Sequence, residues 1–160
     1  MKSEIILWAD DEIDLLKPHV LFLRQKGYEV VTVTNGRDAL DKVEAGHFDL
    51  IILDENMPGL SGLETLSRIK ELAPQTPVVM ITKSEEEDIM NQAIGNKIAD
   101  YLIKPVNPNQ ILLSIKKNLY RKEIISEKTS SGYQQDFNRI NVQINDSLSW
   151  EDWYDVYRRL

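Results

Sequence analysis

Short apolar runs alternate with amphipathic segments along the first 105 residues of the chain. The runs are rich in β-branched side chains and lie at residues 5–9, 28–33, 48–53, 78–82 and 101–103. Most of them lack a polar residue at every second position, which is typical of strands buried on both faces of a parallel sheet. The pattern therefore predicts five strands.

Between these runs, apolar residues recur with helical spacing. They lie within Leu15–Leu23, Ala39–Val43, Leu63–Leu72, Ile89–Ile94 and Ile111–Leu119. Gly27, Gly46 and Ala73-Pro74 follow the first three segments as stop signals, and Asn35-Gly36 opens the second helix. Five β–α units predict an α/β domain with a doubly wound, five-stranded parallel sheet. We assume the flavodoxin-like strand order 2-1-3-4-5, in which the first and third strands are neighbours.

The chain divides into a domain over residues 1–120 and an extension over residues 121–160. The extension carries six basic and seven acidic residues, a sum of −1. After a break at Thr129–Gly132, apolar residues return with helical spacing from Tyr133, and Ser149 with Asp152 resembles a helix start. We expect a helical extension that is the start of a truncated helical bundle.

Composition excludes several function classes. The net charge of −7 argues against non-specific binding to nucleic acid or to an anionic membrane surface. The absence of cysteine excludes disulfides, cysteine-ligated metal sites and thiol catalysis. The first apolar run has only five residues, too few for a signal peptide or a membrane span, so we expect a cytoplasmic protein.

Polar side chains stand where four of the five predicted strands end: Asp10 and Asp11, Asp54, Thr82, and Lys104. In an open parallel sheet, ligands bind outside the carboxyl ends of the strands. Three carboxylates crowded together need a counter-charge, and Mg²⁺ suits a few carboxylates with water and a phosphate. Lys104 offers a charge and Thr82 a hydroxyl for phosphate oxygens. The set predicts phosphoryl transfer to an aspartate, which would form an acyl phosphate.

Four motifs in order carry a family resemblance. They are Asp10-Asp11-Glu12, then Asp54 with Met57-Pro58 and Gly62, then Thr82, then the run from Asp100 to Pro105. Together they resemble a CheY-like receiver domain of response regulators, over residues 4 to about 120.

The resemblance implies a role for each site residue. Asp54 would be the phosphoacceptor, Lys104 would bind the phosphoryl group, and Thr82 would turn to bond one of its oxygens. Tyr101 would rotate inward into the space that Thr82 leaves. Mg²⁺ would be held by Asp10, Asp11, Asp54 and the backbone carbonyl of Asn56. Two positions depart from the usual pattern: Lys83 stands where receivers mostly carry a small residue, and Lys97-Ile98 replaces a common Gly-Ala.

Residues 8–19, 80–87 and 149–153 further resemble PorX-type regulators of the Bacteroidetes. In that family a receiver and a helical segment precede a PglZ domain, a zinc-dependent phosphodiesterase that is absent from this chain. The resemblance implies a role in type IX secretion, with a sensor histidine kinase and an extracytoplasmic-function sigma factor as partners. It also implies a phosphorylation-dependent homodimer. We expect no enzyme with a separate substrate, because a receiver catalyses phosphoryl transfer on its own aspartate.

Three alternatives stay open. A DNA-binding regulator would need a helix-turn-helix in the last 40 or so residues, and their lack of basic charge argues against it. A phosphatase with an Asp nucleophile would carry a second acid two residues after Asp54, where Asn56 stands. A stand-alone receiver would use the extension only as a dimerisation arm.

Overall fold

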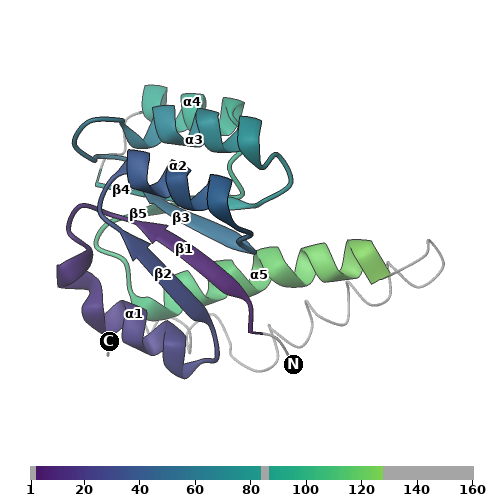
Figure 1. Cartoon of the computed structure of the whole chain (residues 1–160). Helices are drawn as coiled ribbons and strands as arrows, with labels where there is room; N and C mark the ends of the chain where they lie inside the picture. The colour runs from purple at the N-terminus through teal and green to yellow at the C-terminus, as the bar shows by residue number, and fades with distance from the viewer. Residues whose placement is uncertain (1–2, 84–86, 128–160) are drawn as a thin grey trace. The chain divides into compact units, whose positions relative to one another are not determined.

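The computed structural model describes residues 3–83 and 87–127, and of residues 87 and 121–127 the backbone alone. Within these ranges the chain forms one five-stranded parallel sheet (Figure 1). The strand order is β2-β1-β3-β4-β5. The strands are β1 (Ile5–Ala9), β2 (Glu29–Val33), β3 (Leu50–Asp54), β4 (Val78–Thr82) and β5 (Asp100–Ile103). Both the predicted fold class and the assumed strand order are confirmed.

Helices alternate with the strands along the chain. A short 3-10 helix, η1 (Ile13–Leu16), precedes α1 (Lys17–Gln25). The others are α2 (Gly36–Ala45), α3 (Gly62–Leu72), α4 (Glu87–Gly95) and α5 (Pro108–Glu127). Figure 1 shows α2, α3 and α4 over one face of the sheet and α1 on the opposite face.

The central strands are the most buried part of the sheet. Every residue of β3 and β4 is buried, whereas β2, at the edge, has exposed and partly buried as well as buried positions. The core between the sheet and its covering helices includes Leu7, Leu53, Leu66 and Met80, all fully buried. Burial of the middle strands on both faces explains why their sequences are continuous apolar runs.

Capping residues set the start of two helices that the sequence predicts. The side chain of Asn35 accepts a hydrogen bond of 2.8 Å from the backbone N–H of Asp38 at the start of α2. Ser61 does the same for Glu64, at 3.1 Å, at the start of α3. Each bond satisfies a donor that the first turn of a helix leaves unpaired.

Some element limits differ from the sequence pattern. Tyr28 precedes β2, because its N–H bonds to Leu23 O and so closes the end of α1. Gly27, between them, adopts a φ of +99°, a value that glycine accepts without strain. The strand around Ile51 begins two residues later than the apolar run and includes Asp54.

The chain separates into two compact units, residues 1–106 and 107–160. Helix α5 belongs to the second unit and runs through the predicted division at residue 120. Within it, Ile111, Ile115 and Leu119 are buried at a spacing of four residues, as their pattern predicts. The features predicted for residues 128–160 lie outside the described residues. No described helix is long and apolar enough to cross a membrane.

Candidate functional site

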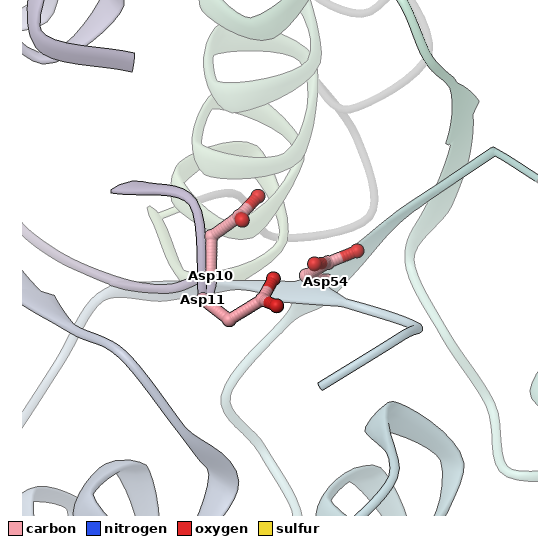
Figure 2. Close-up of side chains that lie close together, drawn as sticks. All are labelled: Asp10, Asp11 and Asp54. Carbon is pink, nitrogen blue, oxygen red and sulfur yellow. The ribbon is translucent and has the colours of Figure 1, made fainter. Parts of the chain in front are cut away.

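Three carboxylates meet at the carboxyl edge of the sheet. Strands β1 and β3 are neighbours with Ala9 opposite Leu53, so the residues that follow in register, Asp10 and Asp54, stand side by side. Asp11 completes the group, and one oxygen of each carboxylate lies within 4.8 Å of the others. Figure 2 shows the three side chains gathered there, with the carboxyl group of Asp11 turned towards Asp54. The sequence prediction brought together the same three residues.

Lys104 supplies the positive charge of this group. Its Nζ lies 3.1 Å from Asp10 Oδ2 and 3.4 Å from Asp54 Oδ1. Its side chain is only 14% exposed, while Asp10 is fully buried and Asp54 is 3% exposed. Burial alone lowers the pKa of Lys104, but the two carboxylates outweigh burial and raise it. Lys104 therefore stays a cation in the site.

Burial, and next the negative charge of Asp10, raise the pKa of Asp54 from 3.8 to about 7. The ammonium of Lys104 and the N–H of Asn56, 3.4 Å from Asp54 Oδ1, act in the opposite sense. The net shift of the Asp54 pKa is upward because burial and the charge of Asp10 together outweigh these two groups. The site therefore carries uncompensated negative charge when all its acids are ionised.

The donor set fits a hard divalent cation. All three carboxylates offer oxygen, the ligand that Mg²⁺ prefers. Asp10 Oδ1 accepts a hydrogen bond of 2.8 Å from Glu12 N–H, whereas Oδ2 is buried and pairs with the Lys104 ammonium. That oxygen faces Lys104 and has a lone pair left for a metal ion.

Thr82 ends β4 beside the carboxylates and is fully buried. Its hydroxyl donates a hydrogen bond of 3.3 Å to Glu55 Oε2. Glu55 in turn is fixed through its backbone: its N–H bonds to Ile81 O and its carbonyl accepts from Gly62 N–H at 2.8 Å. Glu55 thus competes for the hydroxyl that the sequence assigns to phosphate binding.

Gly62 is required by close packing under the loop after β3. A Cβ at this position would collide with the carbonyl oxygen of Asp54 and with the backbone of Glu55. Any side chain would therefore displace the backbone that carries Asp54. This close packing explains why the sequence motif has a glycine at position 62.

A cavity of about 380 Å³ opens beside the carboxylates. Its apolar lining comes from Leu15, Leu16, Pro105 and Val106, and its charges from Glu12, Lys83 and Lys104. Glu12 and Lys83 form an exposed ion pair of 3.9 Å. Since Lys104 lines the cavity and also contacts Asp54, the cavity and the carboxylate group share a residue.

Residues 6–116 match the family described as the response regulator receiver domain. The chain belongs to this family. A receiver domain from Methanospirillum hungatei JF-1, described as CheY-like, has a TM-score of 0.74 at 29% identity and covers 76% of this chain and 98% of its own. The chemotaxis response regulator CheY4 of Vibrio cholerae has a TM-score of 0.68 at 30% identity, covering 74% of this chain and all of its own.

Curated relatives are transcriptional regulators that are longer than this chain. The alkaline phosphatase synthesis transcriptional regulatory protein PhoP of Bacillus subtilis is 31% identical over 95% of this chain and 62% of its own length. The transcriptional regulatory protein ZraR of Escherichia coli O157:H7 is 34% identical over 78% of this chain and 28% of its own.

Residues 123–160 match the PorX response regulator linker domain. This match confirms the resemblance to PorX-type regulators noted in the sequence, over a segment that begins in the last turns of α5. The match is one of sequence alone for residues 128–160, because these lie outside the residues that the structure describes.

The roles assigned to the site residues, Tyr101 and Asn56 included, all stay predictions. Tyr101 on β5 is partly buried and packs against the core that includes Met80, its partner in register. Asn56 is exposed, and its N–H lies 3.4 Å from Asp54 Oδ1. The roles assigned to both depend on states other than the one described.

Sequence reasoning missed Glu55 and His19. Glu55 holds the hydroxyl of Thr82, and His19 bonds to the loop after Lys104. Glu55 could have been noticed as a second acid directly after the phosphoacceptor candidate. His19 gave no signal, because its partner is a backbone carbonyl 87 residues away.

Proposed function

We propose that this chain is the phosphoryl-accepting part of a two-component response regulator, with Asp54 as the acceptor. The observation that carries the proposal is the contact of Lys104 with both Asp10 and Asp54 at the edge where Asp11 also lies. Three carboxylates with one ammonium suit a divalent cation and a phosphoryl group better than any neutral ligand.

The reaction transfers a phosphoryl group to a carboxylate oxygen of Asp54. The donor is a phosphohistidine of a sensor histidine kinase, or a small acyl phosphate in vitro. The new P–O bond to Asp54 forms as the donor's P–N or P–O bond breaks, and the donor imidazole or carboxylate keeps the electron pair. Lys104 neutralises negative charge on the phosphoryl oxygens while the phosphoryl group is transferred.

Asp10, Asp11, Asp54 and the carbonyl of Asn56 would hold the Mg²⁺ ion. Bound there, Mg²⁺ supplies charge that keeps Asp54 ionised and offsets the negative charge of the transferred group. The protein's own part is positional: the register of β1 and β3 sets the spacing of Asp10 and Asp54, and Gly62 keeps the loop after β3 in place.

Phosphorylation would act on Thr82. Its hydroxyl would leave Glu55 and bond a phosphoryl oxygen, and Tyr101 would turn inward, which alters a surface for dimerisation or partner binding. The added charge next to Glu55 favours this exchange, because a carboxylate and a phosphoryl group repel each other.

The chain would serve as the N-terminal part of a PorX-type regulator of type IX secretion in the cytoplasm. It would comprise a receiver over residues 1–120 and a helical extension over residues 121–160. The match of residues 123–160 to the PorX linker supports this context over a DNA-binding output. An extracytoplasmic-function sigma factor and a second copy of the chain would be its further partners.

The test is phosphorylation by acetyl phosphate, followed by intact-mass measurement. One phosphoryl adduct is expected with Mg²⁺ and none with EDTA. Asp54→Asn should lose the adduct, whereas Asp41→Asn, which changes an exposed carboxylate on α2, should keep it. An adduct that survives Asp54→Asn would show that another residue is the acceptor. Light scattering before and after phosphorylation then tests dimerisation.

Transcriptional regulation is the second candidate, since PhoP and ZraR are both named transcriptional regulatory proteins. A gel-shift with phosphorylated full chain at moderate salt would separate it from the first. No shift is expected, because the net charge is −7.

A further inference from the structure

His19 connects helix α1 to the loop that follows β5. Its Nε2 lies 2.8 Å from the carbonyl oxygen of Val106. Because a carbonyl oxygen only accepts hydrogen bonds, Nε2 must carry a proton and donate. His19 Nδ1 is buried and has no hydrogen-bond partner among the described residues, so the bond to Val106 is the polar contact that fixes the ring.

The ring of Trp8 supports His19 from the sheet. The two ring centroids are 6.4 Å apart with planes at 81°, an edge-to-face arrangement that aromatic rings favour. Trp8 is fully buried in β1 and stands two residues before Asp10. The imidazole therefore packs against a residue of β1, the strand that Asp10 and Asp11 directly follow.

The loop that His19 holds carries the site's cation. Lys104 N–H bonds to Thr82 O at 2.6 Å, and this is the last ladder contact of β5. Pro105 has no N–H with which to continue the ladder, and the carbonyl of Val106, one residue on, accepts the hydrogen bond from His19. His19 and Lys104 also line the same cavity.

We propose that His19 is a positioning residue, which holds the loop from Lys104 to Val106 so that the Lys104 ammonium reaches both Asp10 and Asp54. The inference rests on the proposed phosphoryl transfer, because it concerns the same site. A lysine has a long and flexible stem, and its reach to two acceptors depends on where its backbone is held. Without the bond to Val106, the loop shifts and the ammonium neutralises the transferred group less well.

Three variants separate the hydrogen bond from the shape of the ring. His19→Phe keeps a ring against Trp8 but loses the N–H donor, whereas His19→Gln keeps a donor of similar reach. His47→Phe is the matched control, since His47 is 70% exposed and pairs with Asp49. The readout is the initial rate of acetyl phosphate labelling of the full chain at saturating Mg²⁺.

We expect His19→Phe to slow labelling about fivefold, the effect of one lost hydrogen bond, with the His19→Gln rate within about twofold of wild type. His47→Phe should equal wild type. Equal rates for His19→Phe and wild type would overturn the inference while leaving the proposed function intact. A wild-type chain that takes no phosphoryl group overturns both.

A double-variant cycle tests whether His19 acts through Lys104. In a Lys104→Ala background, His19→Phe should cause no further slowing, because the group it positions is gone. The same slowing in both backgrounds would mean that His19 serves the fold in general, and would overturn the positioning role.

One measurement needs no variant, in case His19→Phe does not fold. Nitrogen NMR of the wild-type chain should show a proton on Nε2 of His19 that exchanges slowly with solvent. A neutral ring with its proton on Nδ1 could not donate to Val106 and would refute the inference.

Discussion

Replacing Asp54 by Asn should stabilise the metal-free protein at alkaline pH while abolishing phosphorylation. Asp54 is 3% exposed, and burial together with the nearby charge of Asp10 raises the pKa of its carboxyl group from 3.8 to about 7. Between these two values the folded chain keeps a proton that the unfolded chain has released. The contribution of Asp54 to the free energy of unfolding is therefore highest below about pH 4 and falls as pH rises towards about 7.

The size of the effect follows from linkage. For one group with these two pKa values, the free energy of unfolding falls by about 2 kcal/mol between about pH 5.5 and about pH 8. Asn cannot ionise, so Asp54→Asn lacks this decline. The difference in free energy of unfolding between Asp54→Asn and the wild type should therefore increase by about 2 kcal/mol, in favour of the variant, over that pH interval.

Urea denaturation in EDTA at these two pH values measures this difference. Many other carboxylates also titrate, so the informative quantity is the difference between the wild-type and variant declines rather than either alone. Asp41→Asn removes an exposed carboxylate from α2 and controls for the loss of one charge. If the wild type and Asp54→Asn lose stability in parallel, burial does not perturb Asp54 in the way the structure indicates.

Further predictions concern the same edge of the sheet. Gly62→Ala should cost about 2 kcal/mol, because its Cβ collides with the backbone around Asp54, whereas Gly46→Ala, with open space at its Cβ, should change urea stability by less than about 0.5 kcal/mol. Lys104→Met should lower metal-free stability by about 2 kcal/mol at about pH 8, because two buried carboxylates lose their cation; unchanged urea curves would contradict this. Mg²⁺ at about a hundredfold above its dissociation constant should add about 3 kcal/mol of stability to wild type and less to Asp11→Asn, which thermal melts would resolve.

The sequence was sufficient for the sheet because burial on both faces leaves an unbroken apolar run. Strands β3 and β4 are buried throughout, and both were predicted within two residues. The edge strand β2 was placed one residue early, since Tyr28 is apolar enough to join the run although its N–H closes α1. Local capping by Asn35 and Ser61 is visible in the sequence, so the starts of α2 and α3 are predictable as well.

The acidic group was predictable once the strand order 2-1-3-4-5 was assumed, because residues at the ends of neighbouring parallel strands must meet. Contacts that join a side chain to a distant backbone atom were not. The bond from His19 to Val106 leaves no pattern at either end, since any residue carries a carbonyl. Likewise, the hold of Glu55 on Thr82 depends on the rotamers of two side chains 27 residues apart.

Two of the predictions above have opposite signs although they break the same ion pair. Removing Lys104 should destabilise the fold, and removing the charge of Asp54 should stabilise it. The asymmetry arises because three carboxylates and one ammonium leave an excess of two negative charges when all are ionised. Loss of the contact alone would make both changes unfavourable, so the signs distinguish charge balance from pairing. One divalent cation would neutralise this excess of two negative charges. The ion that the proposed chemistry needs should therefore also raise the free energy of unfolding.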